Sequence, residues 1–118
     1  MNESNLDRVI EIILIDAYGE EEETVAWGTV LTDVIDVPTQ AELLGQTVTV
    51  TEIGSSSGRA EVTASCQRPH GTRGDVTFAD LAFPPDSEAT WLHAAYRHYL
   101  GLQPFPAIPR PDWTWPDQ

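Results

Sequence analysis

Residues 20–35 carry the clearest periodicity in the chain. Their apolar side chains recur every three or four positions, which is the spacing of one face of an α-helix. The side chains concerned are Trp27, Val30 or Leu31, and Val34. Because proline disfavours helical geometry at the preceding residue, Pro38 sets the limit of this helix. The pattern therefore predicts an amphipathic helix from about Glu20 to Ile35.

The segments on either side of this helix are typical of β-strands. Residues 9–15 form a nearly continuous β-branched run, which predicts a buried strand. In residues 47–51 valine alternates with threonine, so the two residue types fall on opposite faces. Further strands are expected at residues 60–64 and 75–78, after turns rich in Gly, Ser and Pro.

A second helix is predicted after these strands. Asp86 or Ser87 can provide its N-cap, and Gly101 its C-terminal stop. One face would carry Trp91, Ala95 and Tyr99. Beyond it, residues 103–118 contain five prolines and two tryptophans, and we expect an extended tail.

The order strand, helix, several short strands, helix predicts an α+β fold. We expect a small antiparallel SH3-like sheet or barrel, with an acidic N-terminal helix and a C-terminal helix packed outside it. A chain of 118 residues fits one domain, which we expect to span residues 1–102 and to be followed by the tail at 103–118.

Charge limits the possible partners. Nineteen acidic residues against six arginines and no lysine give a net charge of −13. Nucleic acid and anionic membrane surfaces are excluded, because both require a basic binding surface. Cations or basic protein surfaces are favoured instead.

The first residues lack the basic region of a signal peptide, and the single cysteine, Cys66, has no partner for an internal disulfide, so we expect a cytoplasmic protein.

No motif indicates an enzyme. There is no glycine-rich phosphate loop, and the serines at 55–57 lack the glycine pattern of a nucleophile elbow. Cys66 and His70 have no second pair to complete a zinc site. His93 and His98 lie five residues apart, on different faces of the predicted helix. We therefore predict a non-enzymatic protein.

Acidic residues gather at both ends of the first predicted helix. Solvated surface acids account for such a pattern, and carboxylates near a helix N-terminus are favoured by the macrodipole. A Ca²⁺ site also accounts for it, because Ca²⁺ takes about six to eight oxygen ligands from carboxylates, carbonyls and water. The candidate metal ligands are Asp16, Glu20, Glu21, Glu22, Glu23, Asp33 and Asp36.

Residues 15–22, Ile-Asp-Ala-Tyr-Gly-Glu-Glu-Glu, together with Ala26-Trp27, Leu31, Asp33 and Pro38, carry a family resemblance. The chain resembles the small acidic calcium-binding proteins first recognised in cyanobacteria, which are CcbP-like and have no EF-hand. The resemblance implies an intracellular Ca²⁺-binding protein, a buffer or a sensor, on an α+β fold. Its matching acids are Asp16, Glu20, Glu21, Glu22 and Asp33.

Two other hypotheses explain the same acidity. An acidic interaction module, or a nucleic-acid mimic, would bind a basic surface on a partner protein. A salt-adapted proteome would give the same composition without a specific function. Selectivity for Ca²⁺ over Mg²⁺ separates the calcium site from the acidic interaction module. Unfolding at low salt identifies the salt-adapted composition.

Overall fold

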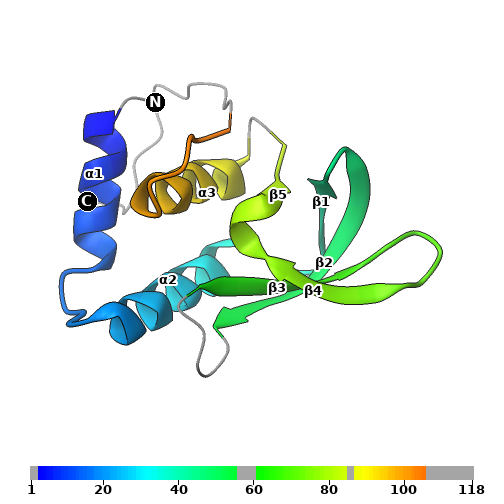
Figure 1. Cartoon of the computed structure of the whole chain (residues 1–118), viewed down its shortest axis with the longest axis horizontal. Helices are drawn as coiled ribbons and strands as arrows, with labels where there is room; N and C mark the ends of the chain where they lie inside the picture. The colour runs from blue at the N-terminus through cyan, green and yellow to red at the C-terminus, as the bar shows by residue number, and fades with distance from the viewer. Residues whose placement is uncertain (1–2, 56–60, 85–86, 106–118) are drawn as a thin grey trace.

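Helices gather on one side of a curved antiparallel sheet in the computed structural model, which describes residues 3–55, 61–84 and 87–105 (Figure 1). The elements in chain order are α1 (Glu3–Ile13), α2 (Glu20–Val34), β1 (Thr39–Leu43), β2 (Gln46–Ser55), β3 (Val62–Gln67), β4 (Arg73–Thr77), the 3-10 helix η1 (Phe78–Asp80), β5 (Leu81–Ala82) and α3 (Glu88–Tyr99). Helix α2 packs on β2 and β3, while α1 packs mainly on α3.

The sheet has the strand order β4-β3-β2-β1-β5, and every pairing in it is antiparallel. Strands β1 and β2 form a hairpin whose two-residue loop, Leu44-Gly45, has positive φ at both positions, as a tight hairpin turn requires. An irregularity in β2 between Val50 and Glu52 increases the local bend. The predicted α+β class is confirmed, with the strands of a small curled sheet following an acidic helix and preceding a C-terminal helix along the chain.

Several predicted elements are confirmed in detail. Helix α2 begins at Glu20 and ends four residues before Pro38, with Trp27 and Leu31 fully buried. Val48 and Val50 are buried, whereas the threonines between and around them are more exposed. Ser87 caps α3, because its hydroxyl oxygen accepts a hydrogen bond from the Thr90 N–H at 3.2 Å.

The predicted strand at residues 9–15 is wrong, because residues up to Ile13 belong to α1. Leu6, Val9 and Ile13 are buried at a spacing of three and four residues, and the intervening charged side chains are exposed. A β-branched run has only a weak preference for strand, and packing of one helical face against α3 overrides it.

The other boundaries differ by a few residues. The predicted strand at 75–78 begins earlier, at Arg73, and Phe78 starts η1. The predicted strand at 60–64 corresponds to β3, which starts at Val62; residue 60 and most of the preceding turn lie outside the described residues. The expected tail is described only as far as Phe105.

Within the described ranges, no helix has the length and apolar character needed to span a membrane.

Aromatic side chains join the helices to the sheet. The rings of Trp27 on α2 and Tyr96 on α3 meet edge to face, with centroids 5.1 Å apart. The Tyr96 hydroxyl accepts a hydrogen bond from the Val62 N–H at 2.9 Å, at the start of β3. These contacts fix α2 and α3 relative to the sheet, and α1 then covers the outer side of α3.

Candidate functional site

A short turn joins α1 to α2 and brings the end of one helix beside the start of the other. The Ala17 N–H donates to the Leu14 carbonyl at 3.0 Å, which closes the first part of the turn. Gly19 has φ of 94°, a conformation that side chains other than glycine disfavour, and its carbonyl accepts from the Glu23 N–H. The run Glu20–Glu23 therefore begins directly after this turn.

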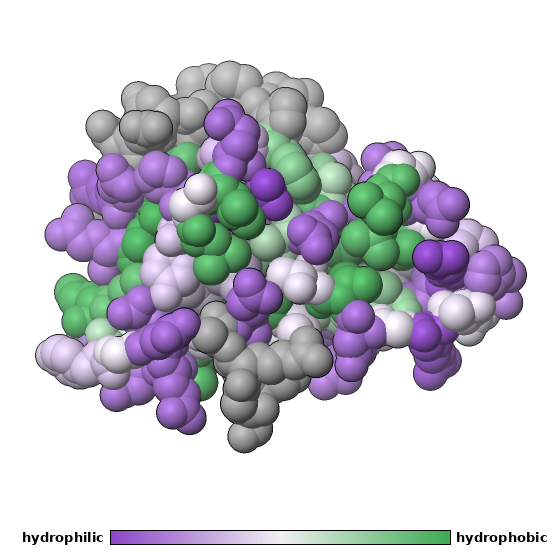
Figure 2. Space-filling view, in the orientation of Figure 1, coloured by the Kyte–Doolittle hydropathy of each residue, from purple (hydrophilic) through white to green (hydrophobic). Residues whose placement is uncertain are grey.

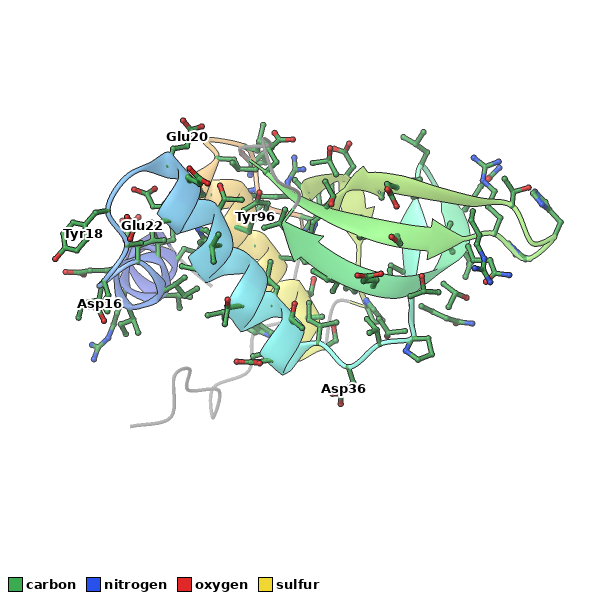
Figure 3. The ribbon with its side chains drawn as sticks, turned by 90° about the horizontal axis from the view of Figure 1, so that it is seen from below. Asp16, Tyr18, Glu20, Glu22, Asp36 and Tyr96 are labelled. Atoms are coloured by element: carbon green, nitrogen blue, oxygen red, sulfur yellow. The ribbon has the colours of Figure 1, made fainter. Side chains whose placement is uncertain are left out.

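A shallow depression of about 390 Å³ lies at this junction. Its apolar lining comes from the end of α1, the turn and the second turn of α2. Asp16, Glu21 and Glu22 add three carboxylates to the same depression. Figure 3 shows Asp16 and Glu22 at the end of the molecule where α1 meets α2. The residues that line it are Ile13, Ile15, Asp16, Ala17, Glu21, Glu22, Val25 and Ala26.

The other two glutamates of the run, Glu20 and Glu23, lie near enough to Tyr99 of α3 for their charges to act on it. The Tyr99 hydroxyl donates a hydrogen bond of 2.6 Å to Glu23 Oε1. Burial raises the pKa of Tyr99 far above its ordinary value, and the negative charges of Glu23 and Glu20 raise it further. In Figure 3 Glu20 lies on the side of the helix start away from Asp16. The four consecutive glutamates thus divide into two pairs with different surroundings.

Asp33 and Asp36 lie at the opposite end of α2. Both side chains are exposed. Asp33 follows Glu20 by thirteen residues, which corresponds to about 20 Å along a helix. Figure 3 shows Asp36 well separated from Asp16 and Glu22. These two aspartates cannot share one ion with the carboxylates of the junction.

The seven predicted ligands are therefore distributed over three places. The junction depression holds Asp16, Glu21 and Glu22, whereas Glu20 and Glu23 lie near Tyr99 and the two aspartates lie at the far end of α2. As the side chains stand in the described ranges, no group of three or more His, Cys, Asp or Glu residues could hold a metal ion. The carboxylates of the depression are exposed to solvent.

The cysteine and histidines are engaged in the structure itself. Cys66 is buried in β3, and burial raises the pKa of its thiol, while His70 is exposed and bonds to the Thr72 hydroxyl at 2.9 Å. His93 is buried with Nε2 3.1 Å from the Phe78 carbonyl oxygen. His98 pairs with Asp7 of α1 at 2.8 Å, so the two histidines of α3 do face different directions.

A larger depression of about 680 Å³ lies on another part of the surface, between β1, β5 and Phe105. Among the described residues that line it, most are apolar, including Phe83 and Pro84, and Glu42 alone is acidic. One carboxylate does not satisfy the oxygen requirement of a hard cation. The junction depression is the better candidate for a cation.

Two features of the junction were missed in the sequence. The first is the apolar contribution of Ile13 and Ile15, because a buried strand at residues 9–15 would place both in the core. An amphipathic pattern that starts at Leu6 was the signal available for α1. The second is the hydrogen bond between Tyr99 and Glu23, which joins residues 76 positions apart and has no local sequence signal.

Comparison with known proteins gives matches in both sequence and fold. The family model for CcbP, described as calcium binding, matches residues 7–68. No curated protein sequence matches the chain. Among solved structures, Anabaena CcbP is 17% identical with a TM-score of 0.73, covering 87% of this chain and 96% of the other. A calcium-binding protein in its calcium-binding form is 17% identical with a TM-score of 0.71, covering 85% and 92%.

Proposed function

Because the chain belongs to the CcbP family of calcium-binding proteins, we propose that it binds Ca²⁺ at the junction of α1 and α2 through Asp16, Glu21 and Glu22. The observation that carries this proposal is the single depression that these three carboxylates line. The junction lies inside the segment matched by the family model, residues 7–68. Membership of the family confirms the resemblance identified from residues 15–38.

The chemistry of the depression suits Ca²⁺ better than Mg²⁺. Ca²⁺ accepts six to eight oxygens in flexible geometry, whereas Mg²⁺ requires a near-ideal octahedron and releases its water reluctantly. Three exposed carboxylates can rotate towards one ion, and turn carbonyls and water would complete the shell. Binding would also neutralise the mutual repulsion of acids held close together at one helix start.

The proposed ligand set is narrower than the seven acids predicted from the sequence. Glu23 already accepts a hydrogen bond from Tyr99, and Glu20 lies on the same side of α2. Asp33 and Asp36 are too distant to join the same ion. We propose that these four acids contribute to the general negative field and not to the site.

We propose an intracellular, non-enzymatic role as a Ca²⁺ sensor, in preference to a simple buffer. A sensor differs from a buffer in that binding alters a surface that a partner contacts. The three carboxylates share their depression with exposed apolar side chains, including Ile15 and Val25. Ligation at this place would change the charge of such a surface directly.

Calcium titration of the metal-stripped protein tests the proposed site. Ligand at 100 times its Kd stabilises a protein by about 2.7 kcal/mol, so Ca²⁺ should raise the Tm measurably, and an equal concentration of Mg²⁺ should raise it much less. We expect the variant Asp16→Asn/Glu21→Gln/Glu22→Gln to lose the Ca²⁺-selective shift and the calorimetric binding signal.

A variant of equal charge provides the control. Glu20→Gln/Asp33→Asn/Asp36→Asn also removes three negative charges, but from positions outside the depression. We expect it to keep the Ca²⁺-selective shift. If this control loses Ca²⁺ binding while Asp16→Asn/Glu21→Gln/Glu22→Gln retains it, the proposed ligand set is wrong.

A further inference from the structure

The junction of α1 and α2 exposes three large apolar side chains close together in the sequence. Ile15, Tyr18 and Val25 are 73%, 78% and 52% exposed, and they are half of the large hydrophobic side chains exposed in the described residues. Figure 2 shows apolar side chains among hydrophilic ones at the left edge, where α1 and α2 meet in Figure 1. We call the junction patch the apolar residues Ile15, Tyr18 and Val25 with the acids Asp16, Glu21 and Glu22.

We propose that the junction patch docks a basic amphipathic helix of another protein, and that Ca²⁺ displaces this helix. The displacement rests on the proposed Ca²⁺ site, whereas the docking stands without it. An exposed apolar surface rimmed by polar groups is characteristic of a protein interaction site. The depression of about 390 Å³ provides a place for an apolar anchor of the partner.

Charge complementarity selects the kind of partner. Ile13, Ala17 and Ala26 line the depression beside Ile15 and Val25, and among the described residues the only charged ones that line it are the three acids. An amphipathic helix with apolar residues at intervals of three and four can lay them on this floor and direct flanking Lys or Arg side chains at the acids. A partner without basic residues would leave these carboxylates facing its surface without compensation.

The same charges disfavour a second copy of this chain as the occupant. Two junction patches brought face to face would place the three acids of one copy against the three of the other. The net charge of −13 adds repulsion at longer range. A basic helix therefore fits the patch better than self-association does.

Ca²⁺ and the basic helix would compete because they need the same oxygens. A carboxylate that coordinates Ca²⁺ no longer offers its charge to a Lys or Arg of the partner. Three exposed ion pairs together contribute about tenfold to affinity, so saturating Ca²⁺ should weaken the helix by about that factor. Mg²⁺ at the same concentration should have a much smaller effect.

The experiment uses the full chain and three synthetic peptides. The probe is an 18-residue Leu/Lys peptide with an amphipathic helical pattern; one control has the same composition in scrambled order, and the other replaces Lys with Glu. Binding is measured by fluorescence anisotropy with EDTA at physiological salt. We expect the amphipathic basic peptide to bind at least about tenfold more tightly than either control. Equal binding of the scrambled peptide would overturn the proposal, since charge alone would then explain it.

Variants locate the binding surface. Ile15→Ser/Val25→Ser should weaken the basic peptide about tenfold or more by removing apolar contact, and Leu44→Ser, at an exposed apolar residue of the β1–β2 loop, should leave it unchanged. The substituted side chains are exposed, so circular dichroism should show an intact fold. If Leu44→Ser weakens the peptide as much as Ile15→Ser/Val25→Ser does, the patch is not the docking site.

Two further outcomes separate the docking from the calcium site. Calcium calorimetry without peptide reports the site alone, and peptide binding in EDTA reports the docking alone. Peptide binding with a Kd unchanged by saturating Ca²⁺ would overturn the competition. Self-association of the full chain that is abolished by Ile15→Ser/Val25→Ser would identify a second copy as the occupant and overturn the proposed partner.

Discussion

His93 is a titratable side chain held inside the aromatic core. Its ring lies 5.1 Å from that of Phe78 and 5.7 Å from that of Phe83, measured between centroids. Its Nε2 is 3.1 Å from the Phe78 carbonyl oxygen, which only accepts hydrogen bonds, so Nε2 carries the proton. Burial lowers the pKa of His93 to about 4, and the nearby positive charge of Arg97 acts in the same direction. The residue is neutral at physiological pH.

This lowered pKa predicts a loss of stability in mild acid. The unfolded chain binds a proton at His93 below about pH 6.5, whereas the folded protein resists it until about pH 4. The free energy of unfolding is therefore unaffected by the titration of His93 above about pH 6.5. It falls by about 3 kcal/mol in all as the pH decreases from about 6.5 to about 4. Urea unfolding from neutral pH to about pH 4 measures it.

The variant His93→Gln isolates this contribution, since glutamine can donate to the Phe78 carbonyl but does not titrate. We expect its free energy of unfolding to fall less between neutral and acid pH than that of the original protein. Parallel pH profiles for the two proteins would show that His93 is not responsible.

At the level of elements, α1 forms one wall of the candidate site. Its apolar face packs on α3, and Asp7 pairs with His98 across the same interface at 2.8 Å. Asp7 is exposed, so this pair contributes little to stability, and burial of Leu6 and Val9 is the main attachment. The position of Asp16 relative to Glu21 and Glu22 depends on this attachment.

Truncation of the buried face of α1 should therefore destabilise the protein. Leu6→Ala removes a side chain that is 4% exposed and should lower the free energy of unfolding by about 3 kcal/mol. Arg8→Ala, at an exposed position of the same helix, should change it by less than about 0.5 kcal/mol. Urea denaturation measures both, and equal effects would contradict the packing described for α1.

Most of the fold could be predicted from local patterns, whereas α1 could not. Helix α2 has a clear apolar stripe, α3 has the Ser87 cap, and the alternation at 47–51 identifies β2. The run from Val9 favours strand when it is considered alone, and only contact with α3 makes it helical. The site was limited by the same lack of tertiary information. The acids could be identified by residue type, but their separation into three places depends on tertiary structure.

At the scale of the whole molecule, negative charge is poorly compensated. The one contact of salt-bridge distance found among the described residues joins Asp7 to a histidine, His98, and the net charge of the chain is −13. Most acids are therefore solvated and repel one another. Such repulsion destabilises a compact state and is screened by salt.

Added NaCl should consequently raise the Tm from its low-salt value, by about 4 °C or more for each kcal/mol of repulsion removed. KCl should do the same at equal ionic strength, and the variant Asp16→Asn/Glu21→Gln/Glu22→Gln should still respond, because the effect is not site-specific. Differential scanning calorimetry measures the shift. A Tm independent of salt would contradict this account, and complete unfolding at low salt would support a salt-adapted origin of the composition.

The division of Glu20–Glu23 into a pair near Tyr99 and a pair at the depression has a consequence for evolution. Each residue of a helix is rotated by about 100° from the one before it. Loss or gain of a single residue within the glutamate run would exchange the surroundings of its members, sending towards α3 a side chain that had faced the depression. Homologous chains with equally many glutamates can therefore differ in cation binding. The position of each glutamate relative to the start of the helix will predict binding better than the number of acids does.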